Sequence, residues 1–128
     1  MLIALLSLMT AAAVDLSAGA RHLAPTNVDG TRQLVALAGE RGVPMLLAST
    51  LSVFVDTDAP RGRFTADDAL PDARICGGYA QTKLLAEGLV RASTVSACCV
   101  RYGLLVPDRR TRSAAAHDWF CLAVRGLA

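Results

Sequence analysis

A short apolar run that directly follows a helical pattern occurs twice in this chain, and this feature most constrains the fold. The two runs are Val43 to Ala48 and Val95 to Tyr102. Their length and flanking residues favour strands of a parallel sheet that are buried on both faces. A helix that leads straight into such a strand is the repeating unit of α/β folds. The sequence therefore predicts an α/β fold, with a parallel sheet flanked by helices.

The two helical patterns can be bounded from the sequence. In the first, apolar positions from Thr26 to Ala38 recur at helical spacing, and Gly42 is placed to end the helix. The second covers 76–94, with its apolar side chains, such as Ala86, on one side. Both patterns predict helices that pack one face against the sheet.

The other segments are predicted to be connections or a last helix. Asp15 to Leu23 is expected to be a polar connection that Pro25 helps to end. The stretch 56–74 is rich in Asp, Pro, Gly and Arg and lacks periodicity, and an excursion of this length is often functional. A basic loop is expected over 107–113, followed by a helix over 114–124.

The N-terminal stretch from Met1 to Val14 is nearly all apolar. No basic residue precedes it, as a signal peptide would require, and it is too short to cross a bilayer. A buried central strand gives the same pattern and is the favoured interpretation, with an export signal as the alternative. We therefore expect a cytoplasmic protein that is not associated with a membrane.

Composition excludes some classes of protein. Apolar residues make up 53% of the 128 residues, which is enough for a buried core. The net charge is only +2, so no nucleic-acid surface is expected. The four cysteines, which lack C-x-x-C spacing, predict buried, reduced thiols rather than a metal site. They are Cys76, Cys98, Cys99 and Cys121.

Tyr79 and Lys83 are the residues most suggestive of chemistry. Of the 13 basic residues, Lys83 is the only lysine, and it follows Tyr79 by four positions, which places both on one helix face. A tyrosine titrates near pH 10 in water, and a neighbouring ammonium lowers its pKa. Lysine can serve a phenol and a sugar hydroxyl together, because its charge is compact and its stem is flexible. The spacing alone is weak evidence, since a tyrosine at a helix start often only packs.

Thr50 adds a hydroxyl at the end of the first predicted strand. Ligands of open α/β sheets bind beyond the carboxyl ends of the strands, where Thr50 is placed. The alternative is that Ser49 and Thr50 only end the strand by local hydrogen bonding.

Taken together, several segments resemble the extended short-chain dehydrogenases/reductases. Within that superfamily they are similar to the thioester reductase branch, which has a male-sterility-type NAD-binding domain. This branch includes the carboxylic acid reductases and the terminal reductase domains of peptide synthetases. The segments that carry the resemblance are Thr26 to Thr31, Ala48 to Phe54, Gly78 to Glu87, Val100 to Gly103, and Asp118 to Cys121 leading to Arg125-Gly126.

The resemblance implies a role for each matching residue. Tyr79 would be the general acid, Lys83 would lower the pKa of Tyr79 and hold the nicotinamide ribose, and Thr50 would orient the substrate carbonyl. Asn27 matches the residue that supports the lysine through the local backbone and water, and Tyr102 matches a residue on the cofactor side. The implied substrate is a carbonyl compound or a thioester on an acyl carrier. NADPH is favoured over NADH.

The sequence departs from the family in one respect, because it contains no G-x-x-G-x-x-G. That turn would receive the cofactor pyrophosphate. Residues 1–128 are therefore expected to be a single, incomplete Rossmann-type NAD(P)-binding domain, the C-terminal half of the fold. We expect such a fragment to be weakly active or inactive and to self-associate through an exposed sheet edge. A sugar-nucleotide epimerase or dehydratase, and a non-catalytic interaction remnant, are the alternatives.

Overall fold

The computed structural model describes Ser7–Met9, residues 12–55 and 75–103, and the single positions 65, 110 and 126. The elements, in chain order, are β1 (Ser7–Met9), α1 (Ala20–Ala24), the π-helical turn η1 (Pro25–Asp29), α2 (Gly30–Arg41), β2 (Met45–Thr50), the 3-10 turn η2 (Leu51–Phe54), α3 (Gly78–Ala92) and β3 (Ala97–Tyr102). Apart from positions 65 and 110, the expectations for 56–74, for 107–113 and for a last helix over 114–124 fall outside the described residues.

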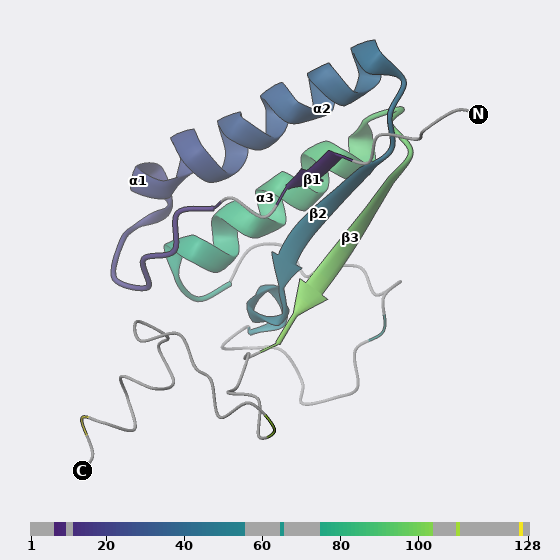
Figure 1. Ribbon diagram of the computed structural model, residues 1–128. Coiled ribbons are helices and arrows are strands. Elements are labelled where there is room, and N and C mark those ends of the chain that lie inside the picture. Colours follow the sequence, from purple (N-terminus) through teal and green to yellow (C-terminus); the bar gives the residue numbers. More distant parts are fainter. Residues whose placement is uncertain are drawn as a thin grey trace.

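The three strands form a parallel sheet in the order β1-β2-β3 (Figure 1). The predicted parallel sheet flanked by helices is therefore confirmed. In this register Leu8 lies beside Leu46, and Thr50 lies beside Tyr102. Within the described residues β1 is an edge strand, because β2 is its one described neighbour. Within the described sheet, β2 is the strand in the central position.

The helical segment before β2 begins earlier than the sequence predicts. Residues 20–41 are continuously helical through α1, η1 and α2, so the expected polar connection up to Leu23 is wrong over its last residues. Pro25, expected to end that connection, instead begins the wider π turn. The Gly30 N–H bonds to the Pro25 carbonyl there. Because proline has no N–H to donate, this local widening lets the helix continue past it.

The hydrophobic core lies between β2 and the two long helices. Met45 and Leu47 of β2 pack with Ala38 of α2 and with Ala86 and Val90 of α3. Alternate residues of β2 are buried, as expected for a strand with one face against helices. Since α2 and α3 also contact each other, both cover the same face of the sheet.

The second predicted strand is less buried than expected. In β3, Ala97, Cys98 and Tyr102 are exposed, because the described helices cover only one face of the sheet. The prediction of buried thiols is wrong for Cys76 and Cys98, which are exposed, while Cys99 is half-buried. All three are free thiols, and Cys121 lies outside the described residues.

Candidate active site

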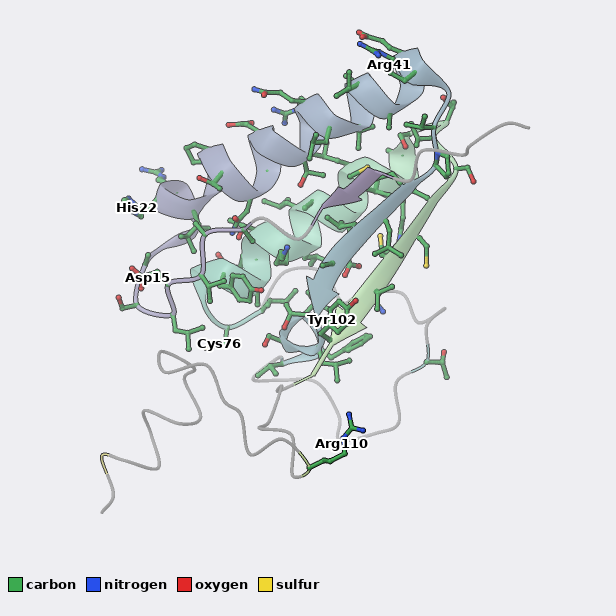
Figure 2. All side chains as sticks on the ribbon, viewed as in Figure 1. Asp15, His22, Arg41, Cys76, Tyr102 and Arg110 are labelled. Atoms are coloured by element: carbon green, nitrogen blue, oxygen red, sulfur yellow. The ribbon has the colours of Figure 1, made fainter. Side chains whose placement is uncertain are left out.

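The parallel sheet brings candidate residues to the end of the sheet where its strands finish. Thr50 ends β2, Tyr102 ends β3, and the two are register partners. Helix α3 runs back against the strands, so its first turn, with Tyr79, lies toward the edge where β2 and β3 end (Figure 1). Figure 2 shows Tyr102 at that edge, and 45% of its surface is exposed. Thr50 and Tyr102 thus lie at the carboxyl ends of the strands, and the first turn of α3 lies toward the same end of the sheet (Figure 1).

The start of α3 is fixed by a close backbone contact. A Cβ atom built on Gly78 would lie 2.4 Å from the carbonyl oxygen of Ala18 and from the nitrogen of Ala20. Only glycine lets α3 approach the backbone at the start of α1 so closely. Gly78 therefore sets the position of Tyr79, the next residue along the helix.

Lys83 is almost completely buried, with 3% of its surface exposed. Its Nζ donates a hydrogen bond of 2.7 Å to the carbonyl oxygen of Ala48, the residue two before Thr50. Burial lowers the pKa of Lys83, and the nearby Glu87 carboxylate partly opposes this effect. The buried amine has three protons and the described residues account for one, which leaves donors suited to the hydroxyls of a ribose.

The pKa of Tyr79 differs from the sequence prediction in direction. Burial raises it above the usual 10.0, whereas the sequence predicts that Lys83 lowers it. The physical reason is that the half-buried phenol loses hydration, while the Lys83 amine is bound to Ala48. Among the described residues, desolvation is therefore the dominant influence on the phenol.

Asn27 is a buried link between three segments. Its Nδ2 donates to the Ala13 carbonyl at 3.1 Å and to Thr82 Oγ1 at 3.0 Å, and its Oδ1 accepts from the Ala13 N–H at 2.8 Å. Thr82 Oγ1 in turn donates to the Tyr79 carbonyl at 2.9 Å. No described hydrogen bond joins Asn27 to Lys83. Asn27 thus holds the first turn of α3 through Thr82, and the support of Lys83 through backbone and water that the resemblance implies stays a prediction.

The hydroxyls at the end of β2 are both engaged. Thr50 Oγ1 accepts from the Ser52 N–H and donates to Ser52 Oγ, each at 3.1 Å, so it caps η2. The local hydrogen bonding considered from the sequence is therefore confirmed for Thr50. Ser49 instead donates to Glu87 Oε1 at 2.5 Å, inside the protein. For Thr50 to donate to a substrate carbonyl, its proton must turn away from Ser52.

Glu87 is the residue that sequence reasoning missed. It is fully buried and accepts hydrogen bonds from Ser49, from Arg101 Nε and Nη2 at 3.1 and 2.8 Å, and from Arg91 at 2.9 Å. Burial alone would raise its pKa, but the bonds from Arg101 and Ser49 and the charges of both arginines lower it below 4.5. The available signal was its spacing, because an acid four residues after Lys83 shares the apolar face of α3.

A separate hollow of about 710 Å³ runs beside β3. Its described lining includes Cys98, Arg101 and Val90, and neither Tyr79 nor Lys83 belongs to that lining.

No three His, Cys, Asp or Glu side chains in the described part of the chain could hold a metal ion together. In the same part, no helix is long and apolar enough to cross a membrane.

Comparison with known proteins identifies the family. Residues 8–128 match a model of NAD-binding domains described as "Male sterility protein". The chain belongs to this family. The resemblance predicted from the sequence is thereby confirmed, as is the Rossmann-type fold.

Solved structures agree with this assignment. The terminal R domain from the myxalamid PKS-NRPS biosynthetic pathway is 29% identical, with a TM-score of 0.80, and the match covers 93% of this chain and 31% of that chain. A thiolation-reductase di-domain from an archaeal non-ribosomal peptide synthetase is 18% identical, with a TM-score of 0.76 over 95% of this chain and 36% of that one. It shows the fold alone.

A sugar-nucleotide enzyme has the same fold. The dTDP-glucose 4,6-dehydratase DesIV from Streptomyces venezuelae, a double mutant with NAD bound, is 23% identical with a TM-score of 0.67. The match covers 95% of this chain and 38% of that chain. This chain thus spans about a third of the length of each of these three proteins. No curated protein matches it significantly.

Proposed function

We propose that this chain supplies the proton-donating and carbonyl-orienting part of an NAD(P)H-dependent reductase. The observation that carries the proposal is the placement of Thr50 and Tyr102 at the carboxyl ends of β2 and β3, toward which the first turn of α3 lies (Figure 1). That turn contains Tyr79, and Lys83 follows it by one helical turn. A phenol whose pKa is raised keeps its proton at neutral pH, as a general acid must before it reacts. Tyr79 would donate that proton to the carbonyl oxygen, and Thr50 would orient the carbonyl.

Lys83 and Tyr102 would hold the nicotinamide end of the cofactor, which supplies the hydride when bound. The buried Lys83 amine fits this role, because a charged donor in a poorly hydrated site binds hydroxyls more strongly than an exposed one. Asn27 would act indirectly, by holding Thr82 and the first turn of α3. We expect NADPH rather than NADH, and the resemblance to the family is the basis for this choice.

The substrate class we propose is a carbonyl compound or a thioester on an acyl carrier. Its support is the likeness to a reductase domain of a peptide synthetase pathway at 29% identity. A sugar-nucleotide epimerase or dehydratase shares the fold but is represented by less similar sequences, such as the 23% identical dehydratase.

The cytoplasm is the proposed compartment. The edges of β1 and β3, unpaired in the described sheet, support self-association, which analytical ultracentrifugation tests.

Cofactor binding to the purified chain tests the proposal. NADPH and NADH would be titrated by nicotinamide fluorescence or calorimetry into the unmodified chain, K83M and R41Q. K83M removes the amine but keeps a side chain of similar length, while R41Q removes an exposed charge at the far end of α2 (Figure 2). We expect saturable binding that K83M weakens about tenfold and R41Q leaves unchanged. Absence of binding at millimolar cofactor, or equal loss in both variants, would contradict the proposal.

A further inference from the structure

Two adjacent residues of β2 are bonded to α3 at positions one turn apart. The Ala48 carbonyl accepts from Lys83, and the Ser49 hydroxyl donates to Glu87. The Ser49–Glu87 contact is buried and the Lys83–Ala48 contact is partly buried, and a polar group left without a partner in such surroundings is costly. They fix how far β2 extends along α3, and Thr50 is the next residue of the strand.

The same carboxylate also holds β3. Ser49 and Arg101 are register partners, and Arg101 donates two hydrogen bonds to Glu87 from a side chain that is only 10% exposed. The guanidinium also lies over the ring of Phe54 in η2, 4.6 Å from its centroid. Thr50 and Tyr102 directly follow Ser49 and Arg101. Glu87 therefore bonds to both β2 and β3 one residue before the proposed site.

We infer that Glu87 is a positioning residue, which aligns the carboxyl ends of β2 and β3 with the first turns of α3 and serves as the counter-charge of Lys83. Lys83 and Glu87 are four residues apart and share a helix face. The functional weight of this role rests on the proposed function, in which Lys83 must be charged and Thr50 must face Tyr79. The electrostatic part can be measured on the chain alone.

The titratable and charged side chains near Lys83 come from α3 and from the described elements that pack against it. On α3 itself they are Tyr79, Glu87 and Arg91, and on β3 they are Cys98, Cys99, Arg101 and Tyr102. β2 and η2 carry no titratable side chain, and those of α1, η1 and α2 are exposed. Of all these groups, Glu87 is the one whose charge raises the pKa of Lys83 against the effect of burial, so it favours the ammonium.

The experiment is a pH titration of the only lysine. Metabolic labelling with lysine carrying ¹³C at Cε gives a single signal, whose shift follows protonation of Lys83 by NMR. In E87Q we expect the titration midpoint to move to lower pH by roughly one pH unit, because desolvation persists without the counter-charge. General loosening of the structure would hydrate Lys83 and move the midpoint upward, toward its usual 10.5. A midpoint that is unchanged or higher in E87Q would overturn the inference.

Two further variants complete the test. R91Q removes the half-exposed partner of Glu87 but leaves the bonds from Ser49 and Arg101, so its Lys83 midpoint should equal that of the unmodified chain. If E87Q does not fold, E87Q/R101Q removes both buried charges and lets the two amides pair. Its midpoint should still lie below that of the unmodified chain, and a midpoint at or above it would overturn the inference.

The positioning role has its own readout. The chain contains two tyrosines, so ring-labelled Tyr79 and Tyr102 can be followed together. We expect the NMR signal of Tyr102 to shift in E87Q or in E87Q/R101Q and to be unchanged in R91Q. A Tyr102 signal that is unchanged when Glu87 is replaced would contradict the positioning role. None of these measurements uses a nicotinamide. Failure to bind NADPH therefore refutes the proposed function, whereas an unmoved Lys83 midpoint refutes the role of Glu87.

Discussion

Replacing Gly78 by alanine tests whether the start of α3 depends on its contact with α1. The new Cβ would lie 2.4 Å from two backbone atoms, the Ala18 oxygen and the Ala20 nitrogen, whereas real Cβ contacts essentially never fall below 3.0 Å. The backbones must therefore separate by at least 0.6 Å, the difference between these two distances. Overpacking of this kind costs about 1–3 kcal/mol, and the upper half of that range applies because backbone rather than a flexible side chain must move.

Gly88 in the same helix provides the matched control. It is exposed, and a Cβ there would meet nothing within 4 Å, so G88A should stabilise the protein by about 0.5–1 kcal/mol. Urea unfolding followed by circular dichroism measures both free energies of unfolding. We expect the midpoint of G78A to fall by roughly 1 M and that of G88A to rise slightly. If G78A unfolds at the same urea concentration as G88A, the close contact does not hold α3 in place.

Three further predictions concern contacts elsewhere in the described structure. N27A removes the three hydrogen bonds that Asn27 makes to Ala13 and Thr82, so it should lower the free energy of unfolding by about 2–3 kcal/mol in urea. A loss under about 1 kcal/mol would contradict the conclusion that Asn27 holds these segments together. Because the folded pKa of Glu87 lies below its usual 4.5, the stability it contributes is present above that pH and is lost as pH falls through the folded value. The urea midpoint should drop in acid, and less so in E87Q/R101Q. G42A should lower the free energy of unfolding by about 1 kcal/mol, measured by thermal unfolding, because Gly42 has φ +61°, a left-handed conformation that strains alanine. A Cβ there would meet nothing within 4 Å, so backbone strain is the expected cause, and unchanged stability would contradict it.

The sheet could be predicted because its signals are local in the sequence. The runs beginning at Val43 and Val95 became strands, although each strand starts two residues later than its run. Pro44 explains the first delay, since a residue without an N–H is a poor member of a ladder, and β2 begins directly after it. Gly42 ends α2 in the left-handed conformation, as its position predicts.

Burial could not be predicted in the same way, because it depends on what covers each face. An apolar run such as Val95 to Tyr102 looks the same whether helices cover one face of the strand or both. Cys98 is exposed for this reason, despite its apolar neighbours in sequence. The continuation of the helix through Pro25 was equally hidden, because a π turn carries no distinctive residue pattern.

The candidate site divides in a similar way. Spacing alone predicts that Tyr79 and Lys83 share a face, and strand ends predict that Thr50 lies near them. The role of Glu87 needs the register of three elements, because its partners Ser49 and Arg101 lie 38 and 14 residues away in sequence. A buried acid can be suspected from an apolar helix face, but its partners cannot be named before the strands are paired.

The pKa values of Tyr79 and Lys83 set a condition on the proposed chemistry. Burial moves the phenol toward keeping its proton and the amine toward losing its own, so desolvation disfavours the charged form of each. A general acid works best when its pKa lies near the operating pH, which for Tyr79 requires a positive charge or donor close to the phenol. Among the described residues, the Lys83 amine is bound to Ala48, and the Glu87 carboxylate favours its charged form. In the proposed function, the catalytic value of Tyr79 therefore depends on Lys83 remaining an ammonium, and the Glu87 carboxylate favours that ammonium.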